Sequence, residues 1–145
     1  MRELPRQLSV DELAELFEGR TRLVERLADR EHPLEAAGEV VRQLTDEEKK
    51  GVLDAHPAIG ATRLSARSAL EQGADDDPAV LDELARLNRK YEERFGFRFV
   101  VFVNRRPKGE IVRILQARLE RTREQELETA LDELVAIAVD RWRNG

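Results

Sequence analysis

The chain has 145 residues, of which 41% are hydrophobic and 38% are charged, a balance typical of one folded domain and unlike that of a disordered chain. Its 25 lysines and arginines are spread among 30 acidic residues for a net charge of -5, which argues against the basic surface of a nucleic-acid-binding protein. The absence of cysteine excludes disulfides and thiolate chemistry, and with two histidines as the remaining nitrogen ligands we expect no metal site.

The N-terminal segment, residues 1–10, is the first feature along the chain. It carries charges and Pro5 where a signal peptide needs an apolar core. No apolar run in the sequence approaches the roughly 20 residues that cross a membrane. The sequence ends in Arg143-Asn144-Gly145, which is not the peroxisomal address. We therefore expect a cytoplasmic protein without a membrane partner.

Three helices are expected in the first third of the chain. Ser9 and Glu12 have the spacing of a capping box, in which each side chain accepts a hydrogen bond from the main-chain N–H of the other residue. This pair predicts the start of the first helix. A second helix is expected from Thr21 and a third from residues 33 to 44, because apolar residues recur there at steps of three and four.

A fourth helix is expected to end just before His56. Thr45 and Glu48 form another capping-box pair, which predicts where this helix starts. Pro57 disfavours the helical conformation at the residue before it, so the helix must end near Ala55. The sequence therefore places His56 at a helix exit.

The next helix is expected from Asp77, an N-cap followed by Pro78, to Gly96 as its C-terminal stop. Residues 97–103, which follow, are aromatic and β-branched, and their local propensity is that of a strand. No partner strand is evident, and a single strand cannot satisfy its backbone by pairing. We therefore expect a buried extended segment whose amides and carbonyls are free to meet a ligand.

Two more helices are expected beyond a turn at Arg106-Pro107-Lys108-Gly109. Apolar residues at helical spacing mark one between residues 111 and 119 and a last, long one between 127 and 138. No repeat or linker is evident, so residues 1–145 are predicted to form a single domain. The predicted fold is all-α, a bundle of about seven or eight helices with one buried extended segment at about 97–103.

The two histidines are candidates for proton transfer, because the ordinary pKa of histidine is about 6.5. Both precede proline, and the pattern alone separates neither His32 nor His56 from a surface histidine without a chemical role. Ser68 and Glu71 share the capping-box spacing, for which a helix cap is the simpler interpretation. Arg141 falls on the apolar stripe of the last helix, so its stem is expected to point inward or to run along the core edge. Its charge then serves either to bind an anion or to interact with the negative end of the helix dipole.

A further signal comes from an ordered set of residues rather than from any one motif. The set consists of His56-Pro57, Gly60, Ser68, Glu71-Gln72, Leu87-Asn88, Tyr91, Arg94-Phe95-Gly96-Phe97, Phe99-Val100, Arg118-Leu119, Glu126, Ala130-Leu131, Glu133, Ile137 and Arg141. In order and spacing it resembles the decarboxylase family that acts on 2-oxo-4-hydroxy-4-carboxy-5-ureidoimidazoline (OHCU). The resemblance covers about residues 45–142, and it is specific as an ordered set although each motif is weak alone.

This resemblance implies a cofactor-free lyase that converts OHCU to (S)-allantoin and carbon dioxide in urate and purine breakdown. It implies His56 as the catalytic acid, with Glu71 and Arg141 as its partners in the site. It also implies a substrate-binding wall made of Pro57, Ser68, Ala69, Leu70, Glu71, Gln72, Phe99, Val100, Val101, Phe102 and Val103. The implied partner is the small molecule OHCU, and a homodimer is a possible assembly because family members are often dimers.

Two other interpretations stay open at this point. A non-enzymatic helical interaction module would explain the caps and amphipathic helices without using His56, and it predicts no concavity between His56, Glu71 and Arg141. A related enzyme that acts on another ureido acid would share the pocket and differ in its substrate.

Overall fold

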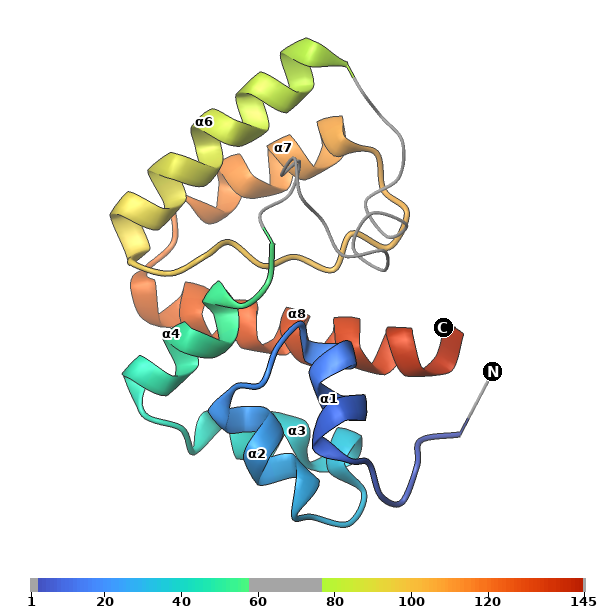
Figure 1. The fold of residues 1–145 in the computed structure, drawn as a ribbon. Helices are drawn as coiled ribbons and strands as arrows, with labels where there is room; N and C mark the ends of the chain where they lie inside the picture. The colour runs from blue at the N-terminus through green and yellow to red at the C-terminus, as the bar shows by residue number, and fades with distance from the viewer. Residues whose placement is uncertain (1–2, 58–76, 145) are drawn as a thin grey trace.

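The computed structural model describes residues 3–57 and 77–144, and these residues form helices joined by loops, with no β-strand among them (Figure 1). The seven helices in these ranges are α1 (Val10–Phe17), α2 (Arg22–Ala28), α3 (Pro33–Arg42), α4 (Asp46–Asp54), α6 (Pro78–Phe95), α7 (Lys108–Arg118) and α8 (Arg123–Asn144). The predicted all-α fold is confirmed. Within the same ranges, no helix has the length and apolarity that crossing a membrane requires.

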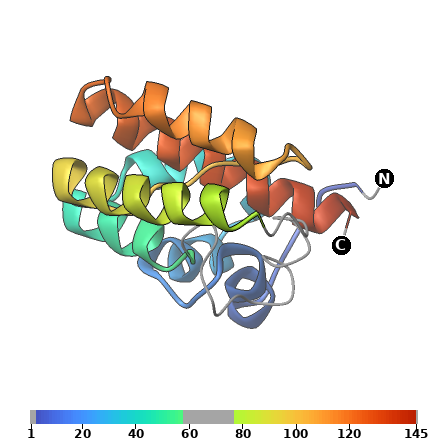
Figure 2. The ribbon, with the colours of Figure 1, turned by 90° about the horizontal axis from the view of Figure 1, so that it is seen from above.

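Helix α8 lies at the centre of the arrangement. It packs against α1, α3 and α4, and the pair formed by α6 and α7 lies on its other side (Figure 1). The view from above shows α7 beside α6 (Figure 2). The predicted apolar stripe of α8 is buried in the core, and Arg141 lies on the same stripe.

Local sequence sets where α1 and α4 begin. The Ser9 hydroxyl accepts a hydrogen bond from the Glu12 N–H at 3.1 Å, and the Glu12 carboxylate accepts one from the Ser9 N–H at 3.0 Å. Thr45 and Glu48 make the same two bonds at 3.1 Å and 2.9 Å. Both predicted capping boxes are confirmed, and a cap of this kind stabilises a helix by about 1 kcal/mol.

The extended segment, residues 97–103, follows α6 directly. Helix α6 ends at Gly96, whose φ of 80° lies in the left-handed region that glycine adopts without strain. Phe97 and Phe99 are each 1% exposed. Their rings pack edge-on against Tyr91 of α6, with centroids 5.9 Å and 5.2 Å away. The predicted buried extended segment is confirmed.

The turn after the extended segment lies earlier than the sequence predicts. Asn104 and Arg105 have φ values of 48° and 62°, so the chain reverses there. Pro107 is the N-cap of α7, and Lys108 and Gly109 already belong to the helix. The prediction was wrong because proline and glycine were both assigned to the turn, whereas proline also favours a helix start.

Candidate active site

His56 follows Ala55, the C-cap of α4. Its main-chain N–H donates to the carbonyl oxygen of Leu53 at 3.2 Å, and 5% of the residue is exposed. Its Nε2 atom is buried and has no hydrogen-bond partner among the residues that the structure describes. A buried polar atom without a partner costs free energy, which a suitable ligand would recover. The predicted place of His56 at a helix exit is confirmed, and its catalytic role stays a prediction.

Arg141 lies on the buried stripe of α8, and 4% of the residue is exposed. Its Nη1 donates to the carbonyl oxygen of Leu16 at 3.0 Å, and its Nη2 forms an ion pair with Glu18 Oε1 at 3.0 Å. The side chains of Arg141 and Glu18 are 2% and 13% exposed, so this pair is largely removed from water. The prediction that Arg141 points inward is confirmed, and one anion that it meets is a side chain of the protein itself.

Glu18 belongs to this site although the sequence interpretation missed it. It caps the C-terminal end of α1 with φ of 63°, a left-handed conformation that costs a non-glycine residue about 1 kcal/mol or more. Its N–H donates to the carbonyl oxygen of Ala14, and its carboxylate meets Arg141. A glutamate after an amphipathic helix carries no local signal of burial, because the residue that buries it lies far along the chain.

The electrostatic surroundings keep the imidazole of His56 neutral. Its pKa is lowered from 6.5 to about 4, chiefly by burial, which penalises the charged form. The positive charge of Arg141 lowers the pKa as well, Glu18 opposes this, and Arg98 adds a smaller lowering. His56, Arg141 and Glu18 therefore form one electrostatic cluster, and at pH 7 His56 is in the form that can accept a proton.

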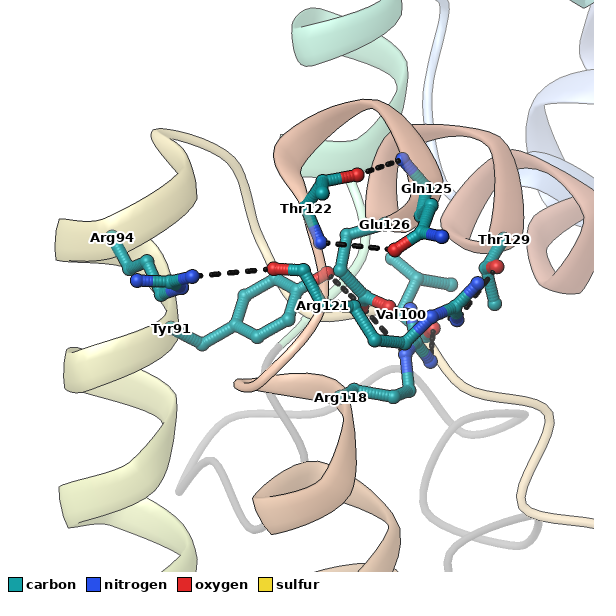
Figure 3. Close-up of polar contacts among 9 residues, drawn as sticks. All are labelled: Tyr91, Arg94, Val100, Arg118, Arg121, Thr122, Gln125, Glu126 and Thr129. Atoms are coloured by element: carbon teal, nitrogen blue, oxygen red, sulfur yellow. Dashed lines mark hydrogen bonds and ion pairs between the residues drawn. The ribbon is translucent and has the colours of Figure 1, made fainter.

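A second buried polar cluster lies between α6, α7 and α8 (Figure 3). Glu126, at 0% exposure, accepts hydrogen bonds from Tyr91 at 2.6 Å and from Arg118 at 2.7 Å. It also accepts one from Arg121 at 2.9 Å. Burial and this carboxylate raise the pKa of Tyr91, so the phenol stays protonated and donates. Arg118 also donates to the carbonyl oxygen of Val100 at 2.9 Å, so this cluster holds the extended segment in place.

The sequence predicts free carbonyl groups in the extended segment, and this prediction is wrong for three of them. Arg118 donates to the carbonyl of Val100, and Arg106 donates to those of Phe102 and Val103. A segment without a strand partner needs other donors, and arginines supply them here. Most of its side chains are also buried: Phe99, Val100, Val101 and Val103 are at most 5% exposed, and Phe102 is partly buried.

Comparison with known proteins identifies the family. Residues 2–143 match the family model described as OHCU decarboxylase. The chain belongs to the OHCU decarboxylase family. The resemblance that the ordered set of residues suggested is thereby confirmed.

Several known proteins are similar to this chain, and their names refer to OHCU decarboxylase or to uric acid degradation. The 2-oxo-4-hydroxy-4-carboxy-5-ureidoimidazoline decarboxylase of Haloferax volcanii is 32% identical over 89% of this chain and 83% of its own length. The decarboxylase of the same name from Halalkalicoccus jeotgali is 31% identical over 72% of this chain and 62% of its own length. The uric acid degradation bifunctional protein of Bacillus sp. (strain TB-90) is 33% identical over 71% of this chain, which spans 22% of that protein. The chain thus spans only part of the length of the last two relatives.

Two solved structures described below share the fold of this chain. A crystal structure of OHCU decarboxylase in the presence of (S)-allantoin matches with a TM-score of 0.76 and 23% identity, over 90% of this chain and 94% of that one. A crystal structure of (S)-allantoin synthase matches with a TM-score of 0.67 and 25% identity, over 91% of this chain and 47% of that one. The helical arrangement is therefore the fold seen in these structures.

The site residues that the family resemblance implies fall into two groups. Ser68, Ala69, Leu70, Glu71 and Gln72 lie outside the described residues, and their roles stay predictions. Among the described residues, the structure brings His56 within electrostatic reach of Arg141 and places the partly buried Pro57 next to it in the chain. It adds Glu18 and Arg98, for which the sequence offered no role.

The lowered pKa of His56 predicts that the free energy of unfolding of this protein depends on pH. The folded pKa of about 4 lies below the ordinary value of 6.5, so the unfolded chain binds the proton first as the pH falls. The free energy of unfolding is therefore expected to fall by about 3 kcal/mol between pH 6.5 and pH 4 because of His56 alone. Urea unfolding of the wild type and of His56→Asn across this range measures the effect. Parallel stability profiles for the two proteins would contradict it.

Proposed function

We propose that this chain decarboxylates OHCU to (S)-allantoin and carbon dioxide. One observation carries the proposal. In a member of the OHCU decarboxylase family, a buried and neutral His56, whose Nε2 lacks a partner among the described residues, lies within electrostatic reach of the buried Arg141. Decarboxylation needs a group that moves protons and a group that binds an anion. Membership of this enzyme family disfavours the helical interaction module, which makes no use of His56.

The proposed reaction breaks the bond between ring carbon 4 of OHCU and its carboxylate. Carbon dioxide leaves, and the bonding electron pair moves into the adjacent ring imine, whose nitrogen takes up a proton. The hydroxyl on carbon 4 then loses its proton and becomes a carbonyl, and carbon 5 gains a proton and becomes the stereocentre of allantoin. One proton is consumed in total, so the protein needs a group that both accepts and donates protons.

His56 is the proposed group for two of these proton transfers, removal of the hydroxyl proton and delivery of a proton to carbon 5. Its neutral imidazole can accept the hydroxyl proton at pH 7. The enolate that this transfer leaves is negatively charged and raises the pKa of the nearby imidazole, so His56 can hold the proton. Donation from this fixed position to one face of carbon 5 would give a single enantiomer. Glu71 is the proposed partner that fixes the tautomer of His56.

Arg141 is the proposed binding group for the substrate's carboxylate. The variant Arg141→Met is expected to raise KM for OHCU at least about tenfold, because a hydrogen bond to a charged group contributes roughly 1.5–3 kcal/mol. It also removes the ion pair with Glu18, so its free energy of unfolding should fall as well. Steady-state kinetics and urea unfolding on the same preparation separate the two effects.

The matched control for this variant is Arg143→Met. Arg143 lies in the same last turn of α8 and is only partly buried, so its loss should leave KM unchanged. Normal saturation of Arg141→Met by OHCU would remove the binding role of Arg141.

The proposed activity is tested by following the optical activity of allantoin formed from freshly generated OHCU. Decarboxylation in water has no preference for either face of carbon 5 and gives a racemic product. Circular dichroism of (S)-allantoin therefore reports the enzyme and not the background. A racemic product formed at the rate seen without protein would overturn the proposal, and turnover of another ureido acid in place of OHCU would reassign the substrate.

A homodimer and a cytoplasmic location also belong to this proposal. The family resemblance supports the homodimer. Sedimentation equilibrium at micromolar concentration would distinguish a dimer from a monomer.

A further inference from the structure

Arg98 holds the C-terminal end of α4, where His56 lies. Its guanidinium Nη1 donates to the carbonyl oxygen of His56 at 2.6 Å and to that of Asp54 at 3.3 Å. Its main-chain N–H donates to Asp54 Oδ1 at 3.0 Å. Arg98 thus contacts the end of α4 from the extended segment by three hydrogen bonds, and one of them goes to His56 itself.

These bonds meet a need that the local sequence creates. The last carbonyl groups of a helix have no intrahelical partner, and Pro57 stops the chain from continuing the helix to supply one. A guanidinium offers several N–H groups in one plane and can serve two carbonyls at once. A positive charge at a helix C-terminal end is also favourable because of the helix dipole.

Arg98 is itself held from a second element. Its Nε lies 3.4 Å from Glu92 Oε1 in the last turns of α6, and its side chain is 30% exposed. The guanidinium is therefore anchored between α6 and α4. This anchoring restricts where the main chain of His56 can lie, and with it the place of the imidazole.

We propose that Arg98 is a positioning residue for His56, which it holds by the main-chain carbonyl. Its positive charge is also a minor influence that disfavours a proton on His56. The kinetic part of this inference rests on the proposed function, and the electrostatic part does not. Three charged side chains act on His56 from the described elements packed around it: Arg141 from α8, Glu18 from the end of α1 and Arg98 from the extended segment. Arg98 also bonds to the main chain of His56.

The test compares Arg98→Gln, which removes the charge, with Arg98→Lys, which keeps the charge on a single flexible group. NMR titration of the His56 imidazole in the substrate-free protein is the first readout, and the chain's other histidine, His32, serves as an internal reference. The pKa of His56 is expected to rise in Arg98→Gln and to stay close to the wild-type value in Arg98→Lys. The kcat for OHCU is expected to fall roughly tenfold to a hundredfold in Arg98→Gln with little change in KM, and less in Arg98→Lys.

The matched control is Arg123→Gln. Arg123 donates to the carbonyl oxygen of Phe95, which is also at the C-terminal end of a helix, but it is not among the described charged side chains that act on His56. If Arg98→Gln shows the same His56 titration as the wild type and the same kcat as Arg123→Gln, the proposal is wrong. If Arg98→Gln does not fold, Arg98→Lys decides the kinetic part, because an unchanged kcat there would also overturn it. If the wild type itself forms no (S)-allantoin, the proposed function fails, while the titration still tests the electrostatic role of Arg98.

Discussion

His56→Asn is expected to lower kcat for OHCU decarboxylation by about a hundredfold to ten-thousandfold, the range that a general acid–base group contributes. Asparagine has a similar size and polarity but cannot accept a proton and return it. Because 5% of His56 is exposed, bulk water cannot readily take over the proton transfer. The initial rate of (S)-allantoin formation, followed by circular dichroism, measures the loss.

The control for this variant is the same substitution at the other histidine. The side chain of His32 is 52% exposed and lies beside Glu35 at the start of α3, so His32→Asn should retain wild-type kcat. Stereospecific turnover by His56→Asn at the wild-type rate would show that another group moves the protons.

Glu126→Ala is expected to lower the free energy of unfolding by about 3–5 kcal/mol, the usual cost of breaking a buried ion pair by removing one partner. The Arg118 side chain, at 7% exposure, would lose the carboxylate that balances its charge. The Tyr91 hydroxyl would lose the oxygen to which it donates. Urea unfolding followed by far-ultraviolet circular dichroism measures the change.

The matched control is Glu124→Ala. Glu124 and Glu126 both lie in the first turn of α8, so both interact favourably with the helix dipole, but Glu124 is exposed. The difference between the two variants therefore isolates the buried cluster from the dipole effect. A loss of stability in Glu126→Ala no larger than that in Glu124→Ala would mean that the cluster does not stabilise the fold.

The sequence predicted the parts of the fold that depend on neighbours in the chain. The capping boxes at Ser9 and Thr45 and the stop at Gly96 each involve residues within a few positions of one another, and all three are found in the structure. The predicted inward direction of Arg141 followed from the helical period alone. Where two local rules competed, as for proline and glycine before α7, the predicted turn was misplaced.

The sequence did not predict contacts between residues far apart in the chain. Glu18 meets Arg141 on α8, Arg98 donates to the carbonyl of His56, and Arg118 donates to that of Val100. Each pairing depends on how helices and the extended segment pack, and no periodic pattern records it. For the same reason, the sequence could not show that carbonyls of the extended segment accept hydrogen bonds from arginine side chains.

The central place of α8 also bears on how the molecule is made. Helices α1, α3 and α4 all pack on α8, which follows them in chain order, and the bond from Arg141 to Leu16 joins residues 125 positions apart. A ribosome releases the earlier helices before α8, so the apolar surface that they bury against α8 stays uncovered until α8 emerges. The joining of such distant segments is a slow step for a helical protein. The pair of Glu18 and Arg141 therefore forms late, and a nascent chain cannot assemble the site before α8 has been synthesised.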